Sequence, residues 1–210
     1  EKIVAAGVSN QIISITASDL LFEDGVTTID LSADTNATGS NVIDVSNDDT
    51  GDNAWTLTGS AGIDTITGDS GADTITSGSG ADAITGGDGI DTIILASGAN
   101  TISDLGVTGD VDIVDLNGGT VIATTTGAWT ASAATDNAGA NAAAFTINVA
   151  SAGAVSLAAA GTSAYGYTVV STGTSAVTGS DDADTLTNSS GSATMVGLAG
   201  IDTFTATAGA

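Results

Sequence analysis

The chain has 210 residues, of which 25 are acidic and only one, Lys2, is basic, so its formal net charge is −24. A chain with so few basic side chains cannot neutralise phosphates, which excludes nucleic acid and anionic lipid surfaces as partners. Cys and His are absent and aromatic residues make up 3%, which excludes disulfide frameworks, zinc or copper sites, and a core of large rings.

Residues 1–58 are predicted to be a degenerate lead-in to a solenoid. Residues 36–44 fit a nine-residue frame, with Asn41 at the place that Asp takes in the units that follow. Residues 50–58 fit it again, but with Trp55 at that place, and we expect Trp55 to cover an end or an edge of the solenoid. A local acidic cluster is interpreted as a solvated loop in preference to a metal site; it comprises Asp48, Asp49 and Asp52.

Residues 59–94 consist of four contiguous nine-residue units, GSAGIDTIT, GDSGADTIT, SGSGADAIT and GGDGIDTII. The fourth place is always Gly, the sixth always Asp and the eighth always Ile. This is the pattern G-G-x-G-x-D-x-U-x, which is typical of a calcium-binding parallel β-helix. The invariant Asp residues are Asp64, Asp73, Asp82 and Asp91.

The residue types of one unit predict its structure. The first six places are rich in the turn formers Gly and Asp, and the last three form a short strand with Ile facing inward. A single unit cannot bury its Ile, so the units must stack, and two units should complete one coil. Asp64 is then expected above Asp82 on one edge, and Asp73 above Asp91 on the other.

Stacked carboxylates about 5 Å apart repel one another, and turn carbonyls add to the negative potential. Calcium resolves this repulsion because it accepts six to eight carboxylate and carbonyl oxygens in flexible geometry, whereas magnesium demands a strict octahedron. The alternative is a polar β-solenoid in which the Asp residues only form turns.

Residues 95–103 continue the frame with Asn100 at the Asp place, where an amide oxygen is a weaker calcium ligand. Residues 102–116 then form two hydrophobic segments that carry Asp104 and Asp110. We interpret these two residues as solvated strand residues, with an extra ligand at that end as the alternative.

Residues 118–178 lose the nine-residue period and are predicted to be a β-rich insert. A separate sandwich-like lobe and degenerate solenoid coils both remain open for it. The period returns in residues 179–210, as GSDDADTLT, NSSGSATMV and GLAGIDTFT. Asp184 and Asp202 should share an edge and form a second, weaker site, whereas Ala193 removes the ligand from the other edge. The last residues begin a further unit, so we expect the chain to continue.

The repeats resemble the RTX (repeats-in-toxin) calcium-binding β-roll of bacterial proteins exported by type I secretion, also known as the hemolysin-type repeat. Residues 102–116 are similar to the strand pair that often closes such a β-roll at about residue 117. The resemblance implies an all-β parallel β-roll with an inserted β-rich lobe. It also implies calcium ligation by the turn aspartates Asp64, Asp73, Asp82 and Asp91, and by carbonyls of Gly59, Gly68 and Gly86.

No enzymatic activity is expected. Residues 68–71 spell GDSG, which looks like a serine protease signature, but the chain has no His to act as a base. No zinc-protease motif or P-loop lysine is present, and no run of about 18 apolar residues predicts a membrane span.

The function expected from this sequence is that of a secreted structural protein at the cell surface or in the extracellular space. Its composition resembles that of S-layer proteins with RTX units, which implies calcium-dependent self-assembly into a lattice, sheath or filament. Two alternatives remain: a stalk segment of a large RTX adhesin, and the secretion domain of an exported enzyme.

Overall fold

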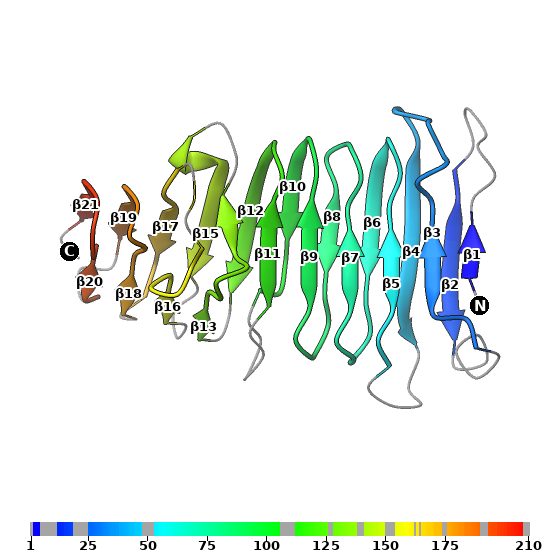
Figure 1. The fold of residues 1–210 in the computed structure, drawn as a ribbon, viewed down its shortest axis with the longest axis horizontal. Coiled ribbons are helices and arrows are strands. Elements are labelled where there is room, and N and C mark those ends of the chain that lie inside the picture. The colour runs from blue at the N-terminus through cyan, green and yellow to red at the C-terminus, as the bar shows by residue number, and fades with distance from the viewer. Residues whose placement is uncertain are drawn as a thin grey trace.

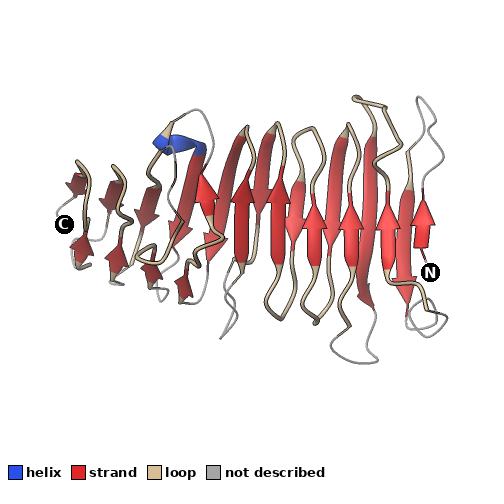
Figure 2. Ribbon diagram, in the orientation of Figure 1, coloured by secondary structure: helices blue, strands red, loops and turns tan. Residues whose placement is uncertain are grey.

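A computed structural model describes residues 2–4, 12–18, 25–47, 53–105, 112–125, 128–137, 141–149, 154–161, 163, 165–173, 176–189 and 193–207. The described strands form a long rod of stacked coils, with β1 and β2 at one end and β20 and β21 at the other (Figure 1). Among the described residues the one helical element is a single 3-10 turn, η1 (Ala142–Ala144) (Figure 2). The all-β, parallel solenoid predicted from the sequence is therefore confirmed.

Two sheets run side by side along the repeat block. In the described part of the chain, one sheet has seven strands, in the order β1 (Lys2–Val4), β3 (Thr28–Asp30), β5 (Thr56–Thr58), β7 (Thr74–Thr76), β9 (Thr92–Leu95), β11 (Ile113–Leu116) and β14 (Asp136–Asn137). We call it the short sheet.

The second sheet extends along the whole rod and is called the long sheet. Its ten described strands are β2 (Ser14–Ser18), β4 (Ser40–Asn47), β6 (Ile63–Thr67), β8 (Ala83–Thr85), β10 (Ala99–Ile102), β12 (Thr120–Thr125), β15 (Phe145–Val149), β17 (Thr168–Ser171), β19 (Thr185–Asn188) and β21 (Thr203–Ala206).

A third sheet replaces the short sheet towards the C-terminus. Its described strands are β13 (Trp129–Thr130), β16 (Val155–Ser156), β18 (Val177–Thr178) and β20 (Met195–Val196). Each strand pairing among the described residues is parallel, which is the geometry that stacked coils require.

Two nine-residue units make one coil, as the sequence predicts. Thr65 pairs with Ala83 in the long sheet and Thr74 pairs with Thr92 in the short sheet, each a displacement of 18 residues. The inward Ile of each unit therefore stacks on the Ile two units later, as Ile66 does on Ile84 and Ile75 on Ile93, and all four side chains are buried. Full burial of such a side chain contributes about 1.5–3 kcal/mol, so the stacked Ile residues hold the coils together.

The described residues between 118 and 178 form coils of the same solenoid. Strands β12, β15 and β17 extend the long sheet from β10, so of the two alternatives left open for this segment, degenerate coils describe the structure and a separate lobe does not. The stack also does not close near residue 117, because β11 pairs onward with β14. The nine-residue period is absent here because the coils are longer: Ala99 pairs with Thr120, and Val121 with Phe145.

Candidate metal centre

A single column of residues lies at the start of the long-sheet strands and contains one of the two predicted rows of ligands. Asn41 pairs with Asp64, and the next two coils place Asp82 and Asn100 in line with them. The Asp64 N–H donates to Oδ1 of Asp82 at 3.0 Å, and the Asp82 N–H donates to the Asn100 amide oxygen at 3.2 Å. One side-chain oxygen per coil thus binds the backbone of the coil before it.

The opposite edge, at the start of the short-sheet strands, repeats this arrangement. The N–H groups of Trp55 and Asp73 donate at 2.8 Å to Oδ1 of Asp73 and Asp91, respectively. The Asp91 N–H donates to Oδ1 of Asp112 at 3.1 Å. Trp55 therefore lies in this row at the place that Asp takes in the next units, and its side chain belongs to the buried hydrophobic core. Sequence reasoning missed Asp112, because it lies 21 residues after Asp91 and so falls outside the nine-residue frame.

The second carboxylate oxygen of Asp64 and that of Asp73 accept hydrogen bonds from the turn of their own unit. Asp64 Oδ2 accepts hydrogen bonds from the Ser60 N–H at 2.6 Å and the Ser60 hydroxyl at 3.0 Å. Asp73 Oδ2 accepts one from the Asp69 N–H at 3.0 Å. In contrast, Oδ2 of Asp82 and of Asp91 is buried without a hydrogen-bond partner among the described residues. Such an atom costs free energy unless a cation or a proton compensates it.

Backbone carbonyls approach the Oδ2 atoms of Asp64 and Asp73 at the first residue of their units. Around the Cα atom of Gly59, the carbonyl oxygen of Ser77 and Oδ2 of Asp64 occupy the space that a Cβ would need. Around Gly68, the carbonyl oxygen of Gly86 and Oδ2 of Asp73 do the same. At these two turns the chain thus brings one carboxylate and one carbonyl from the next coil together, which is the mixed oxygen set that calcium prefers.

Burial without a counter-charge perturbs these carboxyl groups. Desolvation raises the pKa of Asp73 to about 7, that of Asp82 to about 6 and that of Asp91 to about 8. Neighbouring carboxylates raise it further, with Asp112 acting on Asp91 and Asp64 acting on Asp82. Burial likewise raises the pKa of Asp64.

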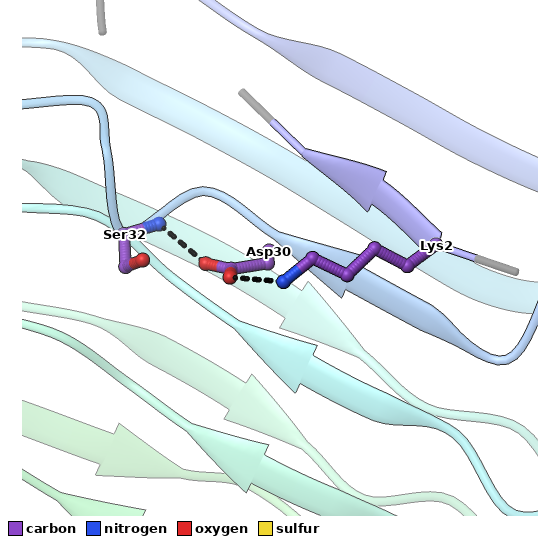
Figure 3. A network of polar contacts seen from close by, with 3 residues as sticks. All are labelled: Lys2, Asp30 and Ser32. Carbon is purple, nitrogen blue, oxygen red and sulfur yellow. Dashed lines mark hydrogen bonds and ion pairs between the residues drawn. The ribbon is translucent and has the colours of Figure 1, made fainter. Parts of the chain in front are cut away.

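The only basic side chain of the protein, that of Lys2, does not compensate the buried aspartates of the two rows. Lys2 forms an ion pair with Asp30 at 3.0 Å in the first coil, where the Ser32 N–H also donates to Asp30 at 2.9 Å (Figure 3). These contacts, with that of Ser32 the larger, lower the pKa of Asp30 to about 2. The buried aspartates must therefore be compensated by protons or by a free cation.

Within the described residues, no three acidic side chains gather closely enough to hold a metal ion by themselves. An ion between two coils must therefore take part of its ligands from backbone carbonyls. Unpartnered buried carboxylate oxygens, nearby carbonyls and the absence of His and Cys fit a hard cation such as calcium.

Comparison with protein families decides the nature of the repeats. The model of the RTX calcium-binding nonapeptide repeat, which spans four copies, matches residues 56–84 and 76–103. Residues 56–103 are RTX repeats. Comparisons with curated proteins and with solved structures found no match. RTX repeats of this type bind calcium, so the cofactor predicted from the sequence is confirmed at the level of the family.

Assignment of individual ligands in the RTX block stays a prediction, but the structure ranks the candidates. All four repeat aspartates are buried in the two rows: Asp64, Asp73, Asp82 and Asp91. The carbonyl oxygen of Gly86, a ligand implied by the resemblance, lies next to Gly68 together with Oδ2 of Asp73. Asn100 is the weakest candidate, because its one side-chain oxygen already accepts from Asp82 and its amide nitrogen is buried without a partner in the described structure. Ser77 is not among the predicted ligands, although its carbonyl oxygen lies next to Gly59 together with Oδ2 of Asp64.

The C-terminal pair lies in the same column as Asp64 and Asp82. The Asp184 N–H donates to Oδ1 of Asp202 at 3.0 Å, and Asp184 Oδ2 accepts from the Ser180 N–H at 2.6 Å. The Gly197 carbonyl and Asp184 Oδ2 meet at Gly179, as their counterparts do in the RTX block. The expectation that Asp184 and Asp202 share an edge is therefore confirmed, and their binding of calcium stays a prediction.

The predictions for the other acidic residues have different outcomes. The preferred interpretation of Asp104 as a solvated strand residue is wrong, because its carboxylate accepts hydrogen bonds from the N–H groups of Gly86 at 3.1 Å and Gly87 at 2.8 Å. Asp110 and the acidic cluster of residues 48, 49 and 52 lie outside the described residues.

Proposed function

We propose that the chain is a calcium-dependent structural segment of a secreted bacterial protein, part of a cell-surface or extracellular assembly such as an S-layer, sheath or filament. The observation that carries this proposal is the continuous solenoid whose buried aspartates have no basic side chain to compensate them, because Lys2 pairs with Asp30. We propose no catalytic role for it, because the buried polar groups of the repeat block are engaged in stacking coils and forming turns.

Calcium gates folding in this proposal. Where calcium is scarce, burial of aspartates and the conformational entropy of a chain with 29 Gly residues oppose the folded state. Outside the cell, calcium binds the folded state only and stabilises it by mass action. Extracellular calcium modules have dissociation constants of about 10⁻⁴ to 10⁻³ M, which suits a protein that is exported unfolded.

The rod shape supports a structural role and is compatible with an adhesin stalk as well. Within the described part of the chain, β2 and β21 are the outer strands of the long sheet, and each pairs on one side only. The last described coil exposes apolar side chains, among them Ile201 and Phe204, which a further coil or another molecule would cover. Among the described residues no helix has the length and apolar character to cross a membrane.

The test is a calcium titration of the chelated chain, followed by far-ultraviolet circular dichroism and by light scattering, with magnesium as the matched control. We expect a cooperative gain of β-structure with calcium alone, and growth of scattering at high protein concentration. Folding without growth of scattering would favour a stalk or a secretion domain over a self-assembling subunit. A chelated chain that is already fully folded and indifferent to calcium would contradict calcium gating.

A further inference from the structure

The turn of residues 86–91 differs from three other turns of the solenoid in how its second N–H is bound. In three turns this N–H donates to Oδ2 of the aspartate in its own unit: Ser60 to Asp64 at 2.6 Å, Asp69 to Asp73 at 3.0 Å, and Ser180 to Asp184 at 2.6 Å. In the turn of residues 86–91 the second N–H, that of Gly87, donates to Oδ2 of Asp104 at 2.8 Å. Asp104 therefore takes the role that Asp91 would otherwise have.

This exchange leaves Asp91 with a carboxylate oxygen that no backbone group binds. Asp91 is fully buried, and its Oδ2 has no hydrogen-bond partner in the described part of the structure. The same oxygen packs against the Cα atom of Gly86, whose N–H donates to Oδ1 of Asp104 at 3.1 Å. The carboxylates of Asp91 and Asp104 thus converge on Gly86 from two successive coils.

The position of Asp104 along the stack makes the comparison with the other turns direct. Ser77 lies 18 residues after Gly59, and Gly86 lies 18 residues after Gly68; each supplies only a backbone carbonyl to the earlier turn. Asp104 lies 18 residues after Gly86 and supplies a carboxylate to it. Asp112, which accepts from the Asp91 N–H at 3.1 Å, adds a further carboxylate on the same edge.

We propose that Asp91 and Asp104 form the tightest calcium site of the chain, and that this site is the first to be occupied. Asp104 and Asp112 both lie beyond residue 103, where the match to the RTX repeat ends. Calcium affinity rises with the number of charged ligands, and at this turn the next coil supplies the carboxylate of Asp104, whereas at Gly59 and Gly68 it supplies a backbone carbonyl. The proposal rests on calcium binding by the repeat block, and it places the start of calcium-driven folding at the C-terminal boundary of that block.

The first test compares calcium binding by the wild-type chain, D104N and D88N in isothermal titration calorimetry. Asp88 is exposed in the same turn, so D88N changes the net charge equally without altering the carboxylates that converge on Gly86. We expect D104N to weaken the first-bound calcium by roughly tenfold or more and D88N to leave it nearly unchanged. Equal weakening by the two substitutions, or none by D104N, would overturn the proposal.

The second test locates the first ion without disturbing its ligands. The protein has two Trp residues, at opposite ends of this row: the Trp55 N–H donates to Asp73 at 2.8 Å, and the Trp129 indole donates to the Asp112 carbonyl at 2.9 Å. Terbium, a calcium substitute, emits when a nearby Trp is excited. We expect W129F, and not W55F, to abolish the sensitised emission of the first terbium equivalent.

The opposite dependence, on Trp55, would place the first ion elsewhere and overturn the proposal. A wild-type chain that binds neither calcium nor terbium would overturn the proposed function together with this inference. That result would be evident before any variant is compared, so the two failures are distinguishable.

Discussion

The backbone N–H of Asp73 donates a 2.8 Å hydrogen bond to Oδ1 of Asp91, the aspartate one coil further along the stack. This contact links successive coils through one carboxylate oxygen and leaves the other for a cation. The two roles of the aspartate are therefore separable: an amide side chain can keep the hydrogen bond while removing the charge.

Asp91→Asn should have opposite effects with and without calcium. The amide oxygen can still accept from the Asp73 N–H, and the buried negative charge, whose Oδ2 has no partner in the described structure, is removed, so the chelated variant should melt at the wild-type temperature or above it. The stabilisation by added calcium should be smaller, because a charged ligand is lost. Thermal unfolding in chelator and in excess calcium measures both effects, with D88N as the control. A large loss of stability in chelator would contradict the separation of roles.

The calcium-free fold should lose stability as pH rises from about 4 to about 8. Burial raises the pKa of Asp73 to about 7, of Asp82 to about 6 and of Asp91 to about 8, whereas a carboxyl group in the unfolded chain titrates near 3.9. Between these values the folded state binds more protons than the unfolded state, so raising the pH favours unfolding. Denaturant unfolding in chelator at several pH values measures this dependence. Stability that rises over this range would contradict it.

The two asparagines of the long-sheet column should respond differently to replacement by aspartate. Asn100→Asp replaces a buried amide nitrogen that has no partner in the described structure, so it should increase calcium binding. Asn41 donates from its amide nitrogen to Asp34 at 3.2 Å and to the Ser60 hydroxyl at 2.9 Å, and both bonds are lost in Asn41→Asp. We expect N41D to destabilise the chelated chain by about 2 kcal/mol or more, and N100D by less. Calorimetric titration with calcium measures the binding of the two variants, and unfolding in chelator measures their stability. A similar response of N41D and N100D would contradict the different environments of the two asparagines.

Gly68→Ala should damage the calcium-bound fold. A Cβ at Gly68 would overlap the carbonyl oxygen of Gly86 and Oδ2 of Asp73. The methyl group would therefore push these two oxygens apart. We expect a loss of about 1–3 kcal/mol in unfolding free energy at saturating calcium, together with weaker calcium binding. Ser70→Ala, at an exposed position of the same turn, is the control and should change neither quantity. Wild-type behaviour of G68A would show that this turn can open without cost.

The repeat block could be predicted closely because its rules are local. The Gly, Asp and Ile places of each unit fix the turn, the edge position and the inward side chain, and the coil of 18 residues follows from the period alone. The stacking of Asp64 on Asp82 and of Asp73 on Asp91 is confirmed for the same reason.

The coils after residue 103 could not be predicted in the same way because their lengths vary. The column that holds Asp64 and Asp82 continues through Val121, Phe145 and Tyr167 before it reaches Asp184. These apolar residues keep the strand pairing and discard the ligands, so the nine-residue signal vanishes while the fold persists. Asp112 was missed as a partner of the repeat, and Asp104 was named only as an alternative ligand, because each acts across a coil boundary that only the structure reveals.

The aromatic part of this column has a mechanical consequence. Phe145 and Tyr167 pack edge to face with their ring centroids 5.2 Å apart, at the place in the column that Asp64, Asp82 and Asp184 take in other coils. Removal of calcium should therefore soften the rod in two separate stretches, one on each side of a middle section whose stiffness does not depend on the ion. Under tension in a calcium-poor medium, such a rod would lengthen from its two flanks while its centre stays intact.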